Sequence, residues 1–163
     1  MSEDRRCITL TAIHKVFKGT PQKIRIVSND IGYGPCPKPT DEVEQHITIN
    51  SGGLVWFSSY VFGEDIGKYK KSKVKIYKIE KAVAEDVLNK TATYFSNEYD
   101  EVFTTDIGNW KMEITNTEGK AYKFRGSLCD NFEVDGVDLS DLIRDSLQID
   151  DLYVFDGRFK PDQ

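Results

Sequence analysis

The segment over residues 46–62 reads HITIN-SGG-LVWFSSYVF, and it decides the fold class. Residues 46–50 alternate polar and apolar side chains, which is typical of a strand with one buried face. Ser51-Gly52-Gly53 then supplies residues that tolerate the positive φ angles of a tight turn. Residues 54–62 continue as an aromatic strand, so the whole segment predicts an antiparallel hairpin.

The second strand of this hairpin carries apolar side chains on both of its faces. Val55 and Phe57 share one face, whereas Leu54, Trp56, Tyr60 and Phe62 share the other. The strand is therefore expected to be covered on both sides, or to use its outer face as a contact surface. A homodimer is one way to cover it. The residues expected in the core are Trp56, Phe57, Leu88, Phe95, Trp110 and Phe124.

The rest of the chain favours further hairpins and two helices. Residues 110–115 and 122–128 alternate around a turn at 116–120, and residues 7–17, 23–28 and the end of 68–79 also predict strands. An apolar stripe of period 3.6 predicts a helix over 80–95. Asp138 is a good N-cap for a short helix through Leu147, and residues 152–155 predict a last strand. The fold class expected is α+β: a mainly antiparallel sheet built from hairpins, one long helix packed on a face, and one short C-terminal helix.

Length and composition indicate one domain over residues 1–163, with a flexible Pro/Gly-rich loop at about 29–43. The 22 Lys and Arg against 27 Asp and Glu give a net charge of −5, which disfavours a general binder of polyanions. No secretory signal is expected at the N-terminus, and no membrane span is expected anywhere along the chain. Three cysteines without a paired motif favour a reducing compartment. The chain is therefore expected to be cytoplasmic, with no membrane partner.

The chemistry-bearing motifs are weak, so no catalytic residue, no cofactor and no metal site is expected. Cys36 and His46 could form a thiolate–imidazole pair around the 29–43 loop, which leaves a small enzyme as an alternative. Asn131, Glu133 and Asp135 with the following glycine copy the start of a calcium loop, but Leu142 stands where that loop needs a glutamate. The same residues also suit a polar turn before a helix N-cap.

The segregation of charge along the chain is a stronger signal than any of the catalytic motifs. Residues 130–151 hold eight acids against one base, Arg144, so the segment could present an acidic face to a basic partner. Seven lysines crowd Lys68–Lys81, interleaved with Tyr69 and Tyr77. This pattern either binds single-stranded nucleic acid or keeps an edge strand from pairing with other edges, and the second interpretation is favoured.

These observations predict a soluble, non-catalytic protein-interaction module, such as an adaptor, an immunity or inhibitor protein, or an accessory protein, bacterial or phage-like in style. Its expected partner is another protein, basic in character, or a second copy of the chain. A nucleic-acid binder that uses Lys68–Lys81 is the other alternative. The residues expected to bind the partner lie on the aromatic strand and in the acidic segment: Trp56, Tyr60, Asp141, Asp145, Asp150 and Asp151.

Overall fold

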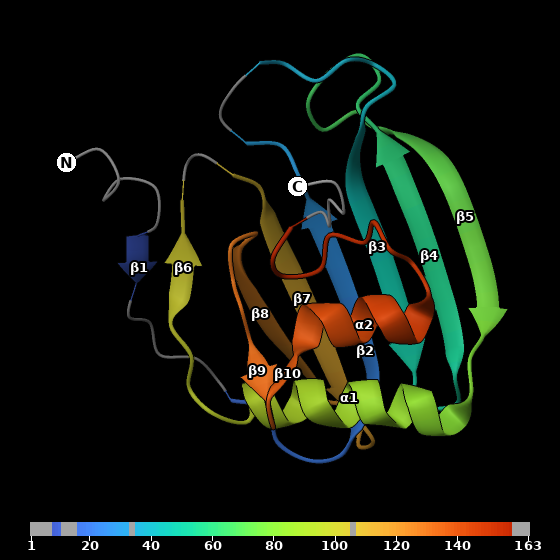
Figure 1. Cartoon of the computed structure of the whole chain (residues 1–163), viewed down its shortest axis with the longest axis vertical. Helices are drawn as coiled ribbons and strands as arrows, with labels where there is room; N and C mark the ends of the chain where they lie inside the picture. The colour runs from blue at the N-terminus through green and yellow to red at the C-terminus, as the bar shows by residue number, and fades with distance from the viewer. Residues whose placement is uncertain (1–7, 11–15, 33–34, 105–106, 158–163) are drawn as a thin grey trace.

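The predicted antiparallel sheet is present, with six strands in the order β5-β4-β3-β2-β7-β8 (Figure 1). The computed structural model describes residues 8–10, 16–32, 35–104 and 107–157. Each pair of neighbouring strands in this sheet is antiparallel. The six strands are β2 (Pro21–Asn29), β3 (Glu42–Asn50), β4 (Leu54–Val61), β5 (Lys70–Lys78), β7 (Asn109–Asn116) and β8 (Ala121–Ser127).

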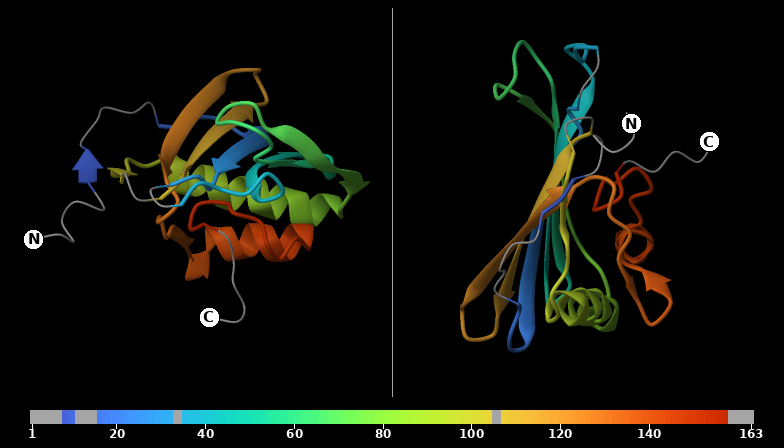
Figure 2. Two further views of the ribbon diagram at one scale, coloured as in Figure 1. Left: turned by 90° about the horizontal axis from the view of Figure 1, so that it is seen from above. Right: turned by 90° about the vertical axis from the view of Figure 1, so that its left-hand side faces the viewer.

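Two helices, α1 (Lys81–Phe95) and α2 (Leu139–Leu147), lie on the same face of the sheet (Figure 2, right). The fold is α+β, with one longer and one short C-terminal helix, as predicted. Two short pairs of strands complete it: β1 (Ile8–Leu10) with β6 (Glu101–Phe103), and β9 (Glu133–Val134) with β10 (Val137–Asp138). Of the strand predicted over 7–17, residues 8–10 form β1, residues 16–17 are not strand, and the remainder lies outside the described residues.

The hairpin that decides the fold class forms as predicted. Gly53 has a φ of 96°, and its amide donates to the carbonyl of Asn50 at 3.1 Å, which closes the turn between β3 and β4. A Cβ at Gly53 would lie 2.4 Å from the carbonyl oxygen of Ile79, so both the φ angle and the close approach require glycine. Directly beside this turn, Val55 pairs with Ile49 on the buried side of the sheet.

Both helices follow their apolar stripes. The buried side chains of α1 recur at helical spacing and rest on the sheet: Ala84, Val87, Leu88, Thr91, Ala92 and Phe95. Asp138 caps α2 as predicted, because its Oδ1 accepts from the amide of Asp141 at 3.1 Å. Gln148, with a φ of 57°, ends α2 in the left-handed conformation.

An aromatic cluster fills the space between the sheet and the helices. Phe95 of α1 lies at its centre, with ring centroids 4.7 Å from Phe124 and 6.1 Å from Trp110. Trp110 in turn contacts Phe155 at 4.8 Å, edge to face. The predicted burial of Phe57, Leu88, Phe95, Trp110 and Phe124 is confirmed.

The strand predicted over residues 152–155 is wrong. These residues are buried but irregular, and Val154 has a positive φ of 45°. Side chains of the sheet supply the hydrogen bonds that a strand neighbour would otherwise supply. Gln45 Oε1 accepts from the amide of Tyr153 at 2.9 Å, and the Ser28 hydroxyl donates to the carbonyl of Val154 at 3.2 Å. The segment therefore covers one side of the core as irregular structure and not as a strand, with its backbone groups satisfied by these side chains.

The expectation that β4 is covered on both sides is also wrong. The helices and residues 149–157 all lie over the face that carries Val55 and Phe57 (Figure 2). No element among the described residues covers the opposite face, which is called the open face below. Trp56 belongs to the open face and is 38% exposed. The prediction that Trp56 is buried in the core is therefore wrong. The alternative expectation, an outer face free to make contacts, fits this arrangement.

Candidate protein-binding surface

Three large apolar side chains gather on the open face at the β4–β5 end of the sheet. Trp56 lies directly opposite Ile76 in the register, and Val74 lies opposite the neighbouring Ser58. Side chains directly opposite one another in an antiparallel pair share a face and touch. Ile76 is 61% exposed and Val74 is 55% exposed. Trp56, Val74 and Ile76 are called the Trp56 patch, and this concentration of exposed apolar area is typical of a contact site.

A polar network borders the Trp56 patch on the open face. His46 Nε2 lies 2.7 Å from Glu44 Oε2, and its Nδ1 lies 3.3 Å from an Arg25 nitrogen. The ring of Tyr60 packs on His46 with centroids 4.6 Å apart. Glu44 also accepts from Asn29 at 3.1 Å, and the hydrogen bond from His46 is the main reason its pKa is lowered. The titratable groups of this network are thus engaged with one another.

Strand β5 forms one edge of the sheet, and no described strand pairs with its outer side. Its nine residues include five lysines and no acid. None of these lysines forms an ion pair with a residue that the structure describes. The register divides the side chains between two faces: Lys73 and Lys75 lie on the helix side, whereas Val74, Ile76 and Lys78 lie on the open side.

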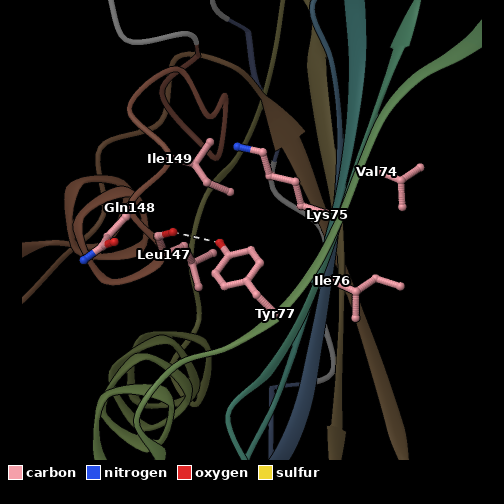
Figure 3. Close-up of a pocket in the computed structure, with 7 residues that line it drawn as sticks. All are labelled: Val74, Lys75, Ile76, Tyr77, Leu147, Gln148 and Ile149. Atoms are coloured by element: carbon pink, nitrogen blue, oxygen red, sulfur yellow. Dashed lines mark hydrogen bonds between the residues drawn. The ribbon is translucent and has the colours of Figure 1, made fainter.

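An open hollow of about 510 Å³ lies along the edge of β5, beside the end of α2 (Figure 3). Its lining comes from both faces of the strand. Val74 and Ile76 project away from α2, whereas Lys75 and Tyr77 project towards it. The Tyr77 hydroxyl donates to the carbonyl of Leu147 at 2.7 Å, and burial raises the pKa of this tyrosine. The hollow thus follows the unpaired backbone edge and is not confined to one face.

The six residues predicted to bind a partner fall on two surfaces rather than one. Trp56 and Tyr60 lie on the open face, on the strand β4. Asp141 and Asp145 belong to α2, and Asp150 and Asp151 follow it, on the helix side of the sheet. All four acids are exposed. The sheet therefore separates the acidic surface from the aromatic one.

Arg144 is a buried cation that the sequence pattern counted only as one base among acids. Its guanidinium donates to Asp141 at 3.1 Å and also bonds Asp156. Asp138, Asp141 and Asp156 bring carboxylate oxygens within 4.8 Å of one another, a spacing that a cation could bridge. Because the Arg144 guanidinium already bonds two of these carboxylates, and Asp138 caps α2, the cluster is explained by the fold.

The segment that copies a calcium loop forms a two-residue hairpin turn instead. Asp135 and Gly136 have φ angles of 54° and 78° and connect β9 to β10. Two consecutive positive φ angles are the signature of a type I′ turn, which this Asp-Gly sequence favours. Asn131, Glu133 and Asp135 are all exposed, and the polar-turn interpretation of the sequence fits their geometry.

The suggested site around the 29–43 loop is dispersed in the described residues. Cys36 is exposed and free in the connection between β2 and β3. His46 lies on β3, where Glu44 and Arg25 occupy both ring nitrogens. A thiolate–imidazole pair needs one of these nitrogens to face the sulfur, so the geometry gives this pair no support.

Comparison with known proteins finds no matching family model, no matching curated protein and no matching solved structure. Neither helix in the described part of the chain combines the length and the apolar character required to cross a bilayer. The sequence predicts Trp56 as part of a contact surface, but this prediction does not include Val74 and Ile76. Their signal in the sequence is two apolar residues that alternate with lysines on an edge strand.

Proposed function

We propose that the chain is a non-catalytic protein-interaction module that binds a partner protein through the Trp56 patch. The observation that carries this proposal is the exposure of Trp56, Val74 and Ile76 as one group on the open face. Tryptophan beside aliphatic side chains is typical of the residues that contribute most to binding between proteins. The proposal places the module in the cytoplasm, in keeping with its odd number of cysteines.

Two features favour a binding role over an enzymatic one. The titratable groups beside the Trp56 patch, His46 and Glu44, are engaged with each other and with Arg25 and Asn29. The hollow beside β5 is open and lined mainly by aliphatic and tyrosine side chains, with Lys75 as its only charged lining residue. An adaptor, an inhibitor or an accessory protein needs a surface of this kind and no reacting group. The acidic surface of α2 stays a predicted site for a basic partner.

Replacing Ile76 with serine should weaken partner binding by at least about tenfold, because it removes a central apolar contact. Trp56→Ser should act in the same direction. Ile66→Ser is a matched control, since Ile66 is 67% exposed in the turn between β4 and β5 and loses the same atoms. Quantitative mass spectrometry after affinity capture from native lysate measures which proteins each variant retains, and circular dichroism checks the fold.

A partner retained by the parent and by Ile66→Ser, but lost by Trp56→Ser and Ile76→Ser, supports the proposal. Equal retention by all four proteins contradicts it. Sedimentation equilibrium on the same samples tests the homodimer: if the second copy covers the patch, the parent is a dimer and Ile76→Ser is a monomer. A recovered nucleic acid in place of a protein would also contradict the proposal.

A further inference from the structure

We propose that β5 is a docking edge for an extended, acidic segment of the partner protein, which pairs with it as a seventh strand of the sheet. This inference rests on the proposed function and specifies its partner. It has three supports: the unpaired backbone edge, the unpaired charge of β5, and the hollow that follows this edge.

The edge itself is suited to strand addition. Over its nine residues β5 contains neither proline nor glycine. Its pairing with β4 is regular from Lys73 to Lys78, the part that carries Val74 and Ile76, and has one register shift between Lys73 and Lys71. Its partner on one side is β4, so alternate amide and carbonyl groups point away from the sheet on the other side. A segment that adds to an edge gains affinity from these main-chain groups and specificity from its alternating side chains.

The charge of β5 selects the occupant. Five lysines without a described ion-pair partner favour a segment rich in aspartate and glutamate. A second copy pairing through the same edge would set these lysines against their own copies, which is unfavourable. The lysines therefore prevent self-pairing but leave pairing with an acidic strand open.

The two faces of β5 specify an alternating pattern in that segment. On the open side its residues would meet Val74 and Ile76, so apolar side chains suit these positions. On the helix side they would meet Lys73 and Lys75 and enter the hollow, whose volume of about 510 Å³ accommodates more than one side chain. Acidic residues with long aliphatic stems, such as glutamate, suit this side because Tyr77, Leu147 and Ile149 line it with apolar atoms.

The tyrosines of the basic segment argue against a single-stranded nucleic acid as the occupant. Base stacking needs aromatic faces presented to solvent. Tyr69 instead packs on Phe62, with centroids 6.3 Å apart, and its hydroxyl accepts from Asn29 at 3.4 Å. Tyr77 is half-buried and bonds Leu147. Both rings are therefore engaged within the fold, and only the lysines are left for a ligand.

The test is a selection from a random peptide library on the immobilised chain at low ionic strength. We expect enriched peptides in which acidic and apolar residues alternate. The double variant Lys73→Glu/Lys75→Glu should bind them at least about tenfold more weakly, and its own selection should enrich basic peptides. Lys111→Glu/Lys123→Glu is the matched control, since it makes the same charge change on β7 and β8, at the other end of the sheet.

Backbone pairing is tested on an enriched peptide itself. Methylation of its amide nitrogens at alternate positions should abolish binding in one register and leave it in the other, because only every second amide of an added strand faces β5. Equal tolerance of both registers would overturn strand addition. Enrichment without acidic residues, or equal binding to the Lys73→Glu/Lys75→Glu variant, would overturn the choice of occupant.

The outcomes separate this inference from the proposed function. Peptides that lose affinity for Trp56→Ser but not for Lys73→Glu/Lys75→Glu would overturn the docking edge and leave the proposed function standing. Enriched peptides that are insensitive to both variants, or no enrichment at all, would count against both. A single-stranded oligonucleotide that displaces the enriched peptides from the chain, and that loses affinity for the charge-reversed variant, would replace the acidic segment by a nucleic acid.

Discussion

Replacing Arg144 with alanine is expected to lower the free energy of unfolding by about 3–5 kcal/mol, because it leaves the buried carbonyls of Leu152 and Gly157 without a donor and the half-buried carboxylate of Asp156 without its cation. Arg144 is only 4% exposed. Chemical denaturation followed by circular dichroism measures the change. A loss of this size is a large fraction of the stability of a domain of this length.

The contacts of Arg144 explain the expected loss. Its Nε donates to the carbonyl of Leu152 at 2.8 Å, and one terminal nitrogen donates to the carbonyl of Gly157 at 2.5 Å. The guanidinium also bonds the carboxylates of Asp141 and Asp156. One side chain on α2 thus holds both ends of the irregular segment 152–157 against the helix. A planar group with five donors can do this, whereas lysine cannot.

Arg25→Ala is the control for Arg144→Ala. Arg25 lies on the open face, is exposed, and contacts the ring of His46 at 3.3 Å. Its loss should change the free energy of unfolding by less than about 1 kcal/mol, as is usual for exposed charges. Similar effects of the two substitutions would mean that water replaces the Arg144 contacts, and that Arg144 does not hold the 152–157 segment against α2.

The hairpins could be predicted from the sequence because their information is local. The alternation of Ile47 and Ile49 with polar residues, and the glycines between β3 and β4, fix both the strands and their register. The same alternation places Trp56 on the face away from Val55. It does not say whether that face is covered, because coverage depends on the side of the sheet to which both helices return.

The irregular segment could not be predicted because its stabilising contacts are distant in sequence. Residues 152–155 have the apolar composition of a strand, yet Ser28 and Gln45 bind their backbone from positions more than a hundred residues earlier. The role of Arg144 was hidden in the same way. Counted along the chain, it is one base among acids, and only the fold shows that it is buried.

The candidate site could be predicted only in part. Exposed aromatic residues and segregated charge could be found in the sequence, and Trp56 with Tyr60 belongs to the surface on which the proposal rests. The acidic residues were grouped with them because composition carries no information about sides of a sheet. The lysines of β5 favour, from the sequence, protection of an edge strand against pairing. That interpretation and the docking edge are compatible, since lysines repel lysines and attract acids.

A second buried charge, Asp130, is placed differently from Arg144. Its Oδ2 accepts from the indole nitrogen of Trp110 at 2.9 Å, and its own amide donates to the carbonyl of Phe155 at 3.1 Å. Gly126 lies beneath them, and a Cβ there would be 2.5 Å from the carboxylate. Asp130 is 6% exposed, and burial raises its pKa from 3.8 to about 6 although the indole hydrogen bond acts in the opposite direction.

This raised pKa makes part of the stability depend on pH. The folded chain binds a proton at Asp130 more tightly than the unfolded chain does, so stability is highest below the unfolded pKa and falls as pH rises through about 6. The difference between the folded and unfolded pKa of Asp130 corresponds to about 3 kcal/mol of stability. In Asp130→Asn the proton equilibrium is absent. The free energy of unfolding of the parent, relative to this variant, should therefore fall by about 3 kcal/mol between about pH 3.5 and pH 7. This range spans the unfolded and the folded pKa of Asp130.

Urea titrations of both proteins across that range measure this difference, and groups common to both cancel. Glu44→Gln is the control of opposite sign. The pKa of Glu44 is lowered in the fold, chiefly by its hydrogen bond with His46, so its contribution is present above its unfolded pKa and is lost as pH falls. Relative to Glu44→Gln, the parent should lose stability on acidification, whereas relative to Asp130→Asn it should gain. A difference between the parent and Asp130→Asn that stays constant with pH would show that water reaches the carboxylate beside Trp110, and that the aromatic core is open at this point.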